Sequence, residues 1–273
     1  MKRNKMASHI RKAAVQGSFY PKECAEVKAL IEKFKQELET IPVSPEIQNI
    51  IPKAVIVPHA GYIYSGFTAN CAYQFLKRSK AKRIIVIGPS HHYYFKGISG
   101  SYYEAYETPC GEIPIDSPYL FALAKQFNIG FEPQAHAKEH STEVQMPFIK
   151  YYFPHTKVIE LIYGDMAVKE LANLILALLH NKENAVIISS DLSHFHTLEE
   201  AKAHDFSCLR AVDTIDAKIL KQGCEACGIT GLHAMLLAAK ELKLSSKLLD
   251  YRTSADATGE TKSVVGYMSA MFY

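Results

Sequence analysis

The sequence has little net charge and no long apolar run, and each absence excludes a class of protein. Lysine and arginine number 31 against 28 aspartate and glutamate, a net charge of +3, which is too small to favour a nucleic acid or an anionic membrane surface as partner. No stretch approaches the roughly 18 apolar residues of a membrane span. The basic start of the chain also lacks the apolar run of about 7 to 15 residues that a signal peptide needs. We therefore expect a cytoplasmic protein.

Internal repeats, low-complexity tracts and glycine- or serine-rich linkers are absent too, which favours a single domain over residues 1–273. Hydrophobic residues make up 48% of the chain, enough for a large core. The six cysteines are scattered, and without an export signal we expect free thiols or metal ligands rather than a disulfide framework. Only Cys224 and Cys227 are close in sequence, and one such pair is a weak indication of a structural zinc site.

Short apolar runs alternate with helical patterns, which is typical of an α/β fold whose sheet is largely parallel. Buried strands are predicted in "KAVIVPHAG", "KRIIVIGPSHH", "KVIELIYGD" and "NAVIISSDLSHF". The runs "SKLLDYRTS" and "SVVGYMSAMFY" read as further strands, added antiparallel to the sheet. An aromatic-rich excursion or hairpin is expected in residues 101–116.

Helices are predicted between these strands from apolar residues at helical spacing. One covers residues 22–39, and another follows the first strand with Ser65 as its cap. Thr142 and Gln145 have the spacing of a capping box for a helix that begins near them.

Three histidines follow apolar runs by a few residues. His59, His91 and His194 would all project from the carboxyl ends of parallel strands, the edge where open α/β sheets bind ligands. Three imidazoles in one crevice indicate metal binding together with acid/base chemistry. The alternative is that each histidine only caps a strand end by bonding to loop backbone.

Cys227 and Asp191 are further candidates. Cys227 precedes a strongly helical run, where the helix dipole would lower the thiol pKa and favour a metal-binding thiolate. A small buried hydrophobic role for Cys227 is equally compatible with its spacing. Asp191, three residues before His194, has the position to orient an imidazole from behind, or to cap the loop.

The segment "AKEHSTE" places Glu139, His140 and Glu143 ahead of a helix. They would line a pocket or, as we favour from composition, be solvated charges at a helix start. His92 differs from His91 because adjacent side chains of an extended segment point to opposite faces. We expect His92 to neighbour a metal ion and not to bind it.

Five motifs together resemble one known family: "VPHAGYIYSG", "IGPSHH", "KEHSTEVQMPF", "SSDLSHF" and "CGITG". Their order and spacing are similar to those of the Memo family, also called AmmeMemoRadiSam system protein B. The resemblance covers nearly the whole chain from Gln16 onward. It implies a fold like that of the class III extradiol dioxygenases of the LigB type, with a central mixed sheet, helices on both faces and an open vestibule at the strand ends.

The resemblance also implies roles for individual residues. His59, His91 and Cys227 would be the metal ligands, and His194 would correspond to the acid/base histidine of the dioxygenases. The dioxygenases bind iron through two histidines and a carboxylate, whereas Cys227 offers a thiol in the third position, which shifts preference toward softer metals. We expect one transition metal ion per chain, with iron or copper favoured and zinc as an alternative.

Three functions are compatible with this site. The first is a dioxygenase-like redox enzyme in which His194 moves protons, Asp191 supports it, and His92, His140 and Tyr62 line the substrate pocket. The second is a zinc hydrolase with metal-activated water. The third is a protein without turnover that binds a metal or a peptide in the same crevice. The substrate would be a small molecule or peptide. The resemblance also implies a functional link to a radical-SAM protein, because bacterial relatives of the family are often encoded with one.

Overall fold

Short, largely buried apolar strands form the parallel centre of the main sheet. The structure is a computed structural model that describes residues 9–41 and 44–273. The central strands, in spatial order, are β2 (Ala54–Val57), β8 (Asn184–Ser189), β3 (Arg83–Pro89) and β7 (Lys157–Tyr163). Each neighbouring pair is parallel, and the valine and isoleucine content suits strands covered on both faces. The predicted parallel strands are confirmed.

Antiparallel strands extend this centre on both sides. β11 (Val264–Phe272) pairs with β2, and β10 (Ser246–Thr253) pairs with β11 as the outer strand. β9 (His194–His196) also pairs with β11, and β4 (Ile98–Gly100) runs antiparallel to β7 at the opposite edge. The mixed sheet and its antiparallel additions are therefore as predicted.

A small second sheet lies beside the main one. β1 (Ile10–Arg11) is parallel to β5 (Ala105–Tyr106), and β5 is antiparallel to β6 (Ile113–Pro114). β5 and β6 form the hairpin that the sequence predicts between residues 101 and 116.

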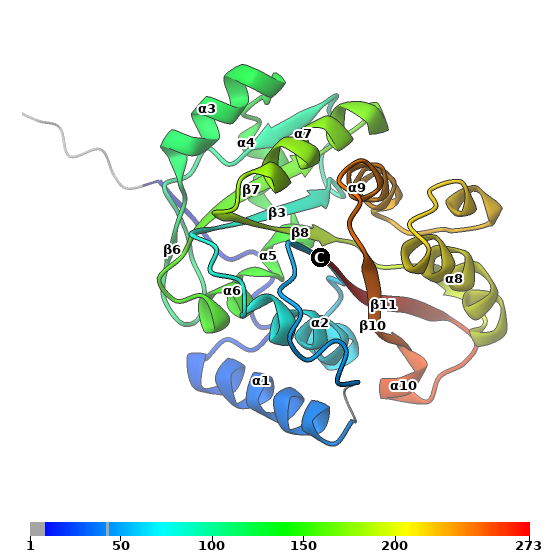
Figure 1. Ribbon diagram of the computed structural model, residues 1–273. Coiled ribbons are helices and arrows are strands. Elements are labelled where there is room, and N and C mark those ends of the chain that lie inside the picture. The colour runs from blue at the N-terminus through cyan, green and yellow to red at the C-terminus, as the bar shows by residue number, and fades with distance from the viewer. Residues whose placement is uncertain (1–8, 42–43) are drawn as a thin grey trace, which may run out of the picture.

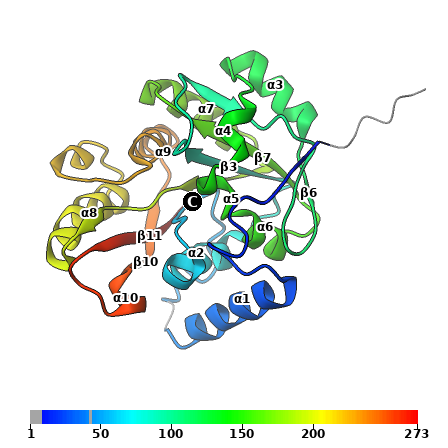
Figure 2. The same cartoon turned by 180° about the vertical axis from the view of Figure 1, so that it is seen from behind.

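Helices cover both faces of the main sheet (Figure 1). The helices are α1 (Cys24–Glu39), α2 (Tyr62–Leu76), α3 (Ser117–Phe127), α4 (Pro133–Ala137), α5 (His140–Glu143), α6 (Met146–Tyr152), α7 (Val168–His180), α8 (Leu198–Asp213), the 3₁₀ helix η1 (Ile219–Gln222), α9 (Ile229–Glu241) and α10 (Ala255–Thr258). α2, with α1 and α6 outside it, lies on one face, and α7 and α9 lie side by side on the other. Figure 2 shows the same layers from behind. Within the described ranges, no helix combines the length and apolar character needed to cross a bilayer.

Two predicted helix starts are wrong because the side chains have other partners. α2 begins at Tyr62, three residues before the predicted cap Ser65, whose hydroxyl donates to a backbone carbonyl of the preceding turn. Thr142 and Gln145 form no capping box. Thr142 donates to a buried carboxylate, and the Gln145 amide donates to the carbonyl that follows β2.

Four of the six cysteines form disulfides, so the expectation of free thiols is wrong for them. Cys24 at the start of α1 is bonded to Cys110 in the β5–β6 turn, and Cys208 on α8 is bonded to Cys224 in the loop before α9. The partners are 86 and 16 residues apart in sequence, and the fold brings them together. Cys224 is therefore not a thiol partner of Cys227.

A buried ion pair fastens β1 to α5. The guanidinium of Arg11 donates to the carboxylate of Glu143, and both side chains are almost completely shielded from solvent. Glu143 also accepts hydrogen bonds from the backbone N–H groups of Ala14 and Val15 and from the hydroxyl of Tyr20. Because each charged group has several partners, this pair avoids the cost of an unpaired buried charge.

A second buried carboxylate, that of Glu160 on β7, joins the small sheet to the same region. It lies 2.9 Å from Nδ1 of His136 and accepts hydrogen bonds from the hydroxyls of Tyr106 at 2.9 Å and Thr142 at 2.5 Å. Burial raises the pKa of Glu160, but the interaction with His136 and the hydrogen bonds outweigh it and lower that pKa below its ordinary value of 4.5. Glu160 is therefore ionised in the native state near neutral pH.

Replacing Arg11 with Met should lower the free energy of unfolding by about 3–5 kcal/mol, because the carboxylate of Glu143 would stay buried without its counter-charge. Urea unfolding followed by circular dichroism measures the change. The exposed Arg210 on α8 provides the control, and Arg210→Met should change stability by less than about 0.5 kcal/mol. Equal effects of the two substitutions would contradict this account of the pair.

Glu160→Gln should flatten the dependence of stability on pH under acidic conditions. The lowered native pKa means that the unfolded chain takes up a proton first, so the contribution of Glu160 is present above about pH 4.5 and is lost as pH falls through the lower native pKa. Unfolding free energies measured from pH 6 downward should fall less steeply in Glu160→Gln than in the wild type. The exposed Glu112→Gln serves as control, and wild-type steepness in Glu160→Gln would disprove the prediction.

Candidate metal centre at the carboxyl edge of the sheet

The carboxyl ends of β2, β3 and β8 bring three polar segments to one edge of the sheet. His59 lies two residues beyond β2, His91 two beyond β3, and Asp191 two beyond β8. Since the three strands are parallel neighbours, these segments meet. The ring centroids of His59 and His91 are 5.2 Å apart.

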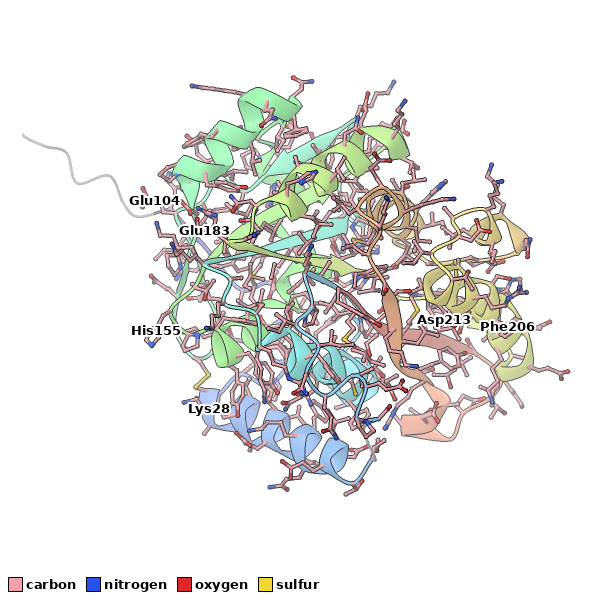
Figure 3. All side chains as sticks on the ribbon, in the orientation of Figure 1. Lys28, Glu104, His155, Glu183, Phe206 and Asp213 are labelled. Carbon is pink, nitrogen blue, oxygen red and sulfur yellow. A yellow bond between two sulfur atoms is a disulfide. The ribbon has the colours of Figure 1, made fainter. Side chains whose placement is uncertain are left out.

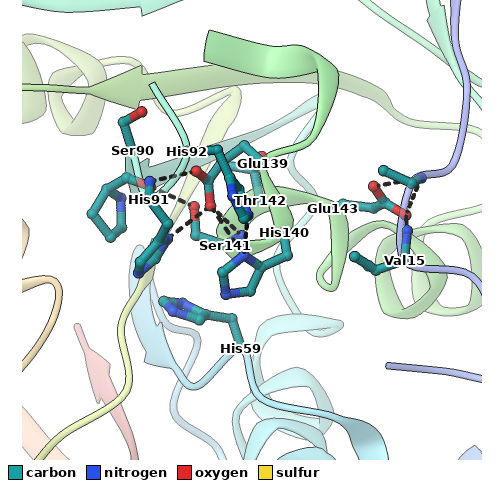
Figure 4. Close-up of polar contacts among 12 residues, drawn as sticks. Val15, His59, Ser90, His91, His92, Glu139, His140, Ser141, Thr142 and Glu143 are labelled. Carbon is teal, nitrogen blue, oxygen red and sulfur yellow. Dashed lines mark hydrogen bonds and ion pairs between the residues drawn. The ribbon is translucent and has the colours of Figure 1, made fainter. Parts of the chain in front are cut away.

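α5 contributes a third imidazole at the same place. The ring of His140 has its centroid 5.4 Å from that of His59 and 4.5 Å from that of His91. One ligand nitrogen from each ring lies within 4.8 Å of the other two, a spacing suited to a metal ion. Figure 4 shows the three rings facing one another below the carboxylate of Glu139. We call His59, His91 and His140 the histidine site.

Ser189 determines which nitrogen His59 presents. The Ser189 hydroxyl donates to the carbonyl of Ser141 at 2.6 Å and lies 3.0 Å from Nδ1 of His59. A hydroxyl has one proton, so Nδ1 of His59 is the donor and Nε2 keeps its lone pair. Burial and the charge of His91 lower the pKa of His59 to about 3. The ring is therefore neutral near pH 7, the form that binds metals.

Glu139 orients the second imidazole. Its carboxylate accepts hydrogen bonds from Nδ1 of His91 at 2.8 Å, from the backbone N–H of His91 at 2.6 Å and from that of Ser141 at 2.9 Å. Burial raises the pKa of Glu139, but the hydrogen bonds and charge of His91 outweigh it and bring that pKa to about 2. A carboxylate behind a ligand histidine is a recurrent feature of metal sites, since it fixes the ring and raises its basicity.

His140 has a less constrained environment than the other two rings. Its Nδ1 lies 3.5 Å from a carboxylate oxygen of Glu139 and 3.3 Å from Nε2 of His92. Burial and the charges of His59 and His91 lower the pKa of His140 to about 4. His140 is thus also neutral near pH 7 and able to act as a ligand.

Cys227 and Asp191 lie against His59 from the other side. The Cys227 sulfur is 3.4 Å from Nε2 of His59 and accepts a hydrogen bond from the backbone N–H of Asp191 at 3.3 Å. The expected lowering of the thiol pKa by the following helix is wrong, because burial and the charge of Asp191 raise the pKa of Cys227 to about 12. The group is therefore a thiol near neutral pH, with Nε2 of His59 at 3.4 Å and the backbone carbonyl of Asp191 at 3.6 Å as the acceptors within reach.

The other predicted site residues are placed in different surroundings. His194 is half-buried at the start of β9, and its charge acts on both His59 and Asp191. His92 is exposed beside His140. Tyr62 is buried in the first turn of α2, where its hydroxyl donates to the carbonyl of Val144. The structure thus brings His59, His91, His140 and Cys227 together, with His92 at the rim.

The expectation of solvated charges in "AKEHSTE" is wrong, since Glu139 and Glu143 are fully buried. Sequence reasoning placed His140 in the pocket wall and missed Ser189 and the role of Glu139 behind His91. The signal available was a glutamate directly preceding a histidine at the start of a short polar segment. The glutamate can be recognised as a partner of His91 only once the fold shows that the end of β3 lies beside this segment.

The chain is similar to one protein family over nearly its whole length. A family model described as "Memo-like protein" matches residues 11–271. A "MEMO1 family protein" of Saccharolobus solfataricus is 33% identical over 285 residues, which covers 96% of this chain and 99% of the relative. Proteins with the same description from Methanobrevibacter smithii and Aquifex aeolicus are 32% and 30% identical over 281 and 273 residues, again covering 96% and 99%.

Glu139→Gln should weaken metal binding by about 10–100-fold, the usual cost of losing a carboxylate behind a ligand histidine. Gln keeps the shape of the side chain but turns one oxygen into a donor, which cannot accept from His91. Affinity for added zinc or ferrous ions, measured by calorimetry, reports the effect. Glu112→Gln on the surface should bind like the wild type, and wild-type affinity in Glu139→Gln would show that Glu139 does not support a ligand.

Proposed function

Because the chain belongs to the Memo family, we propose that it is a redox protein with a dioxygenase-like site that holds one iron or copper ion. The observation that carries the proposal is the convergence of His59, His91 and His140 with the sulfur of Cys227 at one edge of the sheet. Its substrate would be a small molecule or a peptide.

The donor set fits a transition metal. His59 and His91 would bind through Nε2, because Nδ1 of each is engaged by Ser189 or Glu139. Cys227 would be the third ligand, because its sulfur lies 3.4 Å from Nε2 of His59. A set of imidazoles and a thiolate favours iron, copper or zinc over magnesium or calcium. When bound, iron or copper supplies reversible electron transfer.

Metal binding at Cys227 must displace a proton. The pKa of Cys227 is raised to about 12, so the thiol loses its proton only in exchange for the ion, and affinity should fall as pH drops. His140 lies close enough to replace or join the thiol as a ligand.

Asp191 and His194 would accept and donate protons during the reaction. Asp191 accepts the backbone N–H of His59 at 2.7 Å, and its second oxygen is 4.0 Å from Nε2 of the same ring. Burial raises the pKa of Asp191, which keeps a protonated form closer to neutral pH. His194 is half-buried and would exchange a proton with a substrate that enters past His92.

Tyr62 would support this pocket from beneath, through the bond that holds α2 to the carbonyl of Val144. A functional link to a radical-SAM protein belongs to the same proposal and rests on the resemblance to AmmeMemoRadiSam system protein B. No nucleic acid or membrane partner is proposed, because the small net charge favours neither.

The three imidazoles of the histidine site favour a second candidate, a zinc hydrolase. A three-histidine set leaves one position of a tetrahedral zinc ion for water, whose pKa falls to about 7 in such sites. His194 would then be the general base. The third candidate is a protein that binds a metal or a peptide without turnover. Identifying the bound metal and assaying redox and hydrolytic turnover would distinguish the three candidate functions.

Cys227→Ser should lower the affinity for iron or copper by at least about tenfold, because a direct ligand contributes no less than a supporting one. Cys71→Ser is the matched control, since Cys71 is the other free cysteine; Cys224 is unsuitable because it is in a disulfide. Metal content after purification without added metal, followed by titration of the metal-free protein, measures both variants. The wild type should hold iron or copper and open few or no simple catechol rings.

Wild-type affinity in Cys227→Ser, combined with loss of binding in His140→Ala, would show that three imidazoles form the ligand set. Stoichiometric zinc with hydrolytic turnover would favour the second candidate over the redox proposal. Efficient catechol cleavage would contradict the expectation that the thiol separates this site from that of the extradiol dioxygenases.

A further inference from the structure

A second cluster of metal-binding side chains lies outside the histidine site. His196 ends β9, His204 lies on α8, and Glu225 lies in the loop before α9. Nε2 of His196 is 2.6 Å from one carboxylate oxygen of Glu225, and Nδ1 of His204 is 3.3 Å from the other. One ligand atom from each residue lies within 4.8 Å of the other two. We call His196, His204 and Glu225 the peripheral cluster.

The carboxylate of the peripheral cluster has no permanent cationic partner. In the part of the chain that the structure describes, Glu225 pairs with the two histidines and with neither lysine nor arginine. The side chains of His196, His204 and Glu225 are 30%, 31% and 45% exposed. An ion can therefore enter from solvent without any rearrangement of the core.

Covalent and hydrogen-bonded constraints hold the three residues in place. Cys208 follows His204 by one helical turn and shares its face of α8, and its disulfide to Cys224 fixes the residue next to Glu225. Nδ1 of His204 donates to the carbonyl of Gly223 at 3.0 Å, which links this loop to α8 in the metal-free protein. An ion bound through Nδ1 would displace this proton and its hydrogen bond, whereas the disulfide would stay in place.

A capping box fixes the third element. Thr197, directly after His196, is the N-cap of α8, and its side chain and that of Glu200 bond reciprocally to each other's backbone. The turn from β9 into α8 therefore has a defined geometry. A ligand set with this degree of preorganisation loses little conformational freedom when an ion binds.

We infer that the peripheral cluster is a second metal site, which takes a borderline divalent cation such as Zn²⁺. Two imidazole nitrogens and one carboxylate oxygen are a ligand set that zinc uses, and the fourth position would remain with water. Magnesium and calcium are disfavoured because they prefer oxygen ligands.

An ion in the peripheral cluster would join three segments at the outside of the molecule. α8 lies at the periphery, where the side chain of Phe206 is exposed at the outside of the molecule (Figure 3). β9 carries His194, and the loop with Glu225 leads to Cys227 two residues later. The peripheral ion would therefore restrain two segments that also contribute residues to the sheet edge.

The test uses the full chain with its disulfides intact and with His91→Ala and His140→Ala, which remove two imidazoles from the histidine site. Calorimetric titration of this variant with zinc ions alone should still show one zinc ion bound at the peripheral cluster. Adding His204→Ala or Glu225→Gln should weaken that binding by at least about tenfold. His180→Ala, which removes an exposed histidine from α7, should leave it unchanged.

Both peripheral substitutions are at half-exposed positions, and circular dichroism checks that each variant is folded. If the background variant does not fold, the same substitutions in the wild-type chain should lower the number of bound zinc ions by one. Unchanged zinc binding in both His204→Ala and Glu225→Gln, in whichever background is measured, would overturn the inference. Because these residues are separate from the histidine site, the result is independent of the proposed redox function.

Discussion

The buried carboxylate of Glu139 is the interaction on which the geometry of the histidine site depends. It accepts three hydrogen bonds, two from His91 and one from Ser141, and so ties the loop after β3 to the start of α5. The same contacts set the orientation of the His91 ring and the position of His140 next to it. These contacts, all made within the chain, hold the histidines at a spacing suited to a metal ion.

Buried carboxylates also explain how so short a helix as α5 holds its place. A four-residue helix has no stability of its own in water. Glu139 binds it to the sheet edge, Glu143 binds it to Arg11 in β1, and Thr142 donates to Glu160 on β7. The polar side chains of α5 thus replace the apolar face by which longer helices are fixed, and they link the histidine site to the small sheet.

The strands and their carboxyl ends could be predicted because each depends on a short stretch of sequence. Apolar runs that stop at polar residues define β2, β3 and β8 and place His59 and His91 beyond them. The same reasoning failed for Glu143, whose partner Arg11 is 132 residues away in sequence. A glutamate near a helix start has the same local pattern whether it is solvated or buried, so only the fold distinguishes the two.

The disulfides and the position of His140 beside the other imidazoles could not be predicted from the sequence either, because they too depend on contacts between distant segments. The link between Cys24 and Cys110 depends on where the β5–β6 turn lies relative to α1, which no periodicity encodes. His140 joins the other imidazoles because Glu139 draws the start of α5 to the end of β3. Both features are consequences of contacts between distant segments, whereas hydrophobic patterning reports only local structure.

The position of β8 has a consequence for how the chain reaches its native state. β8 begins at Asn184 and lies between β2 and β3, which are both complete by Pro89. During folding the inner edges of these two earlier strands must remain unsatisfied until a segment made much later is inserted between them, and such non-local pairing is slow. Unpaired strand edges are also the part of a folding intermediate most prone to aggregate. His59 and His91 can reach their final separation only after this insertion, so the histidine site forms late, together with the centre of the sheet.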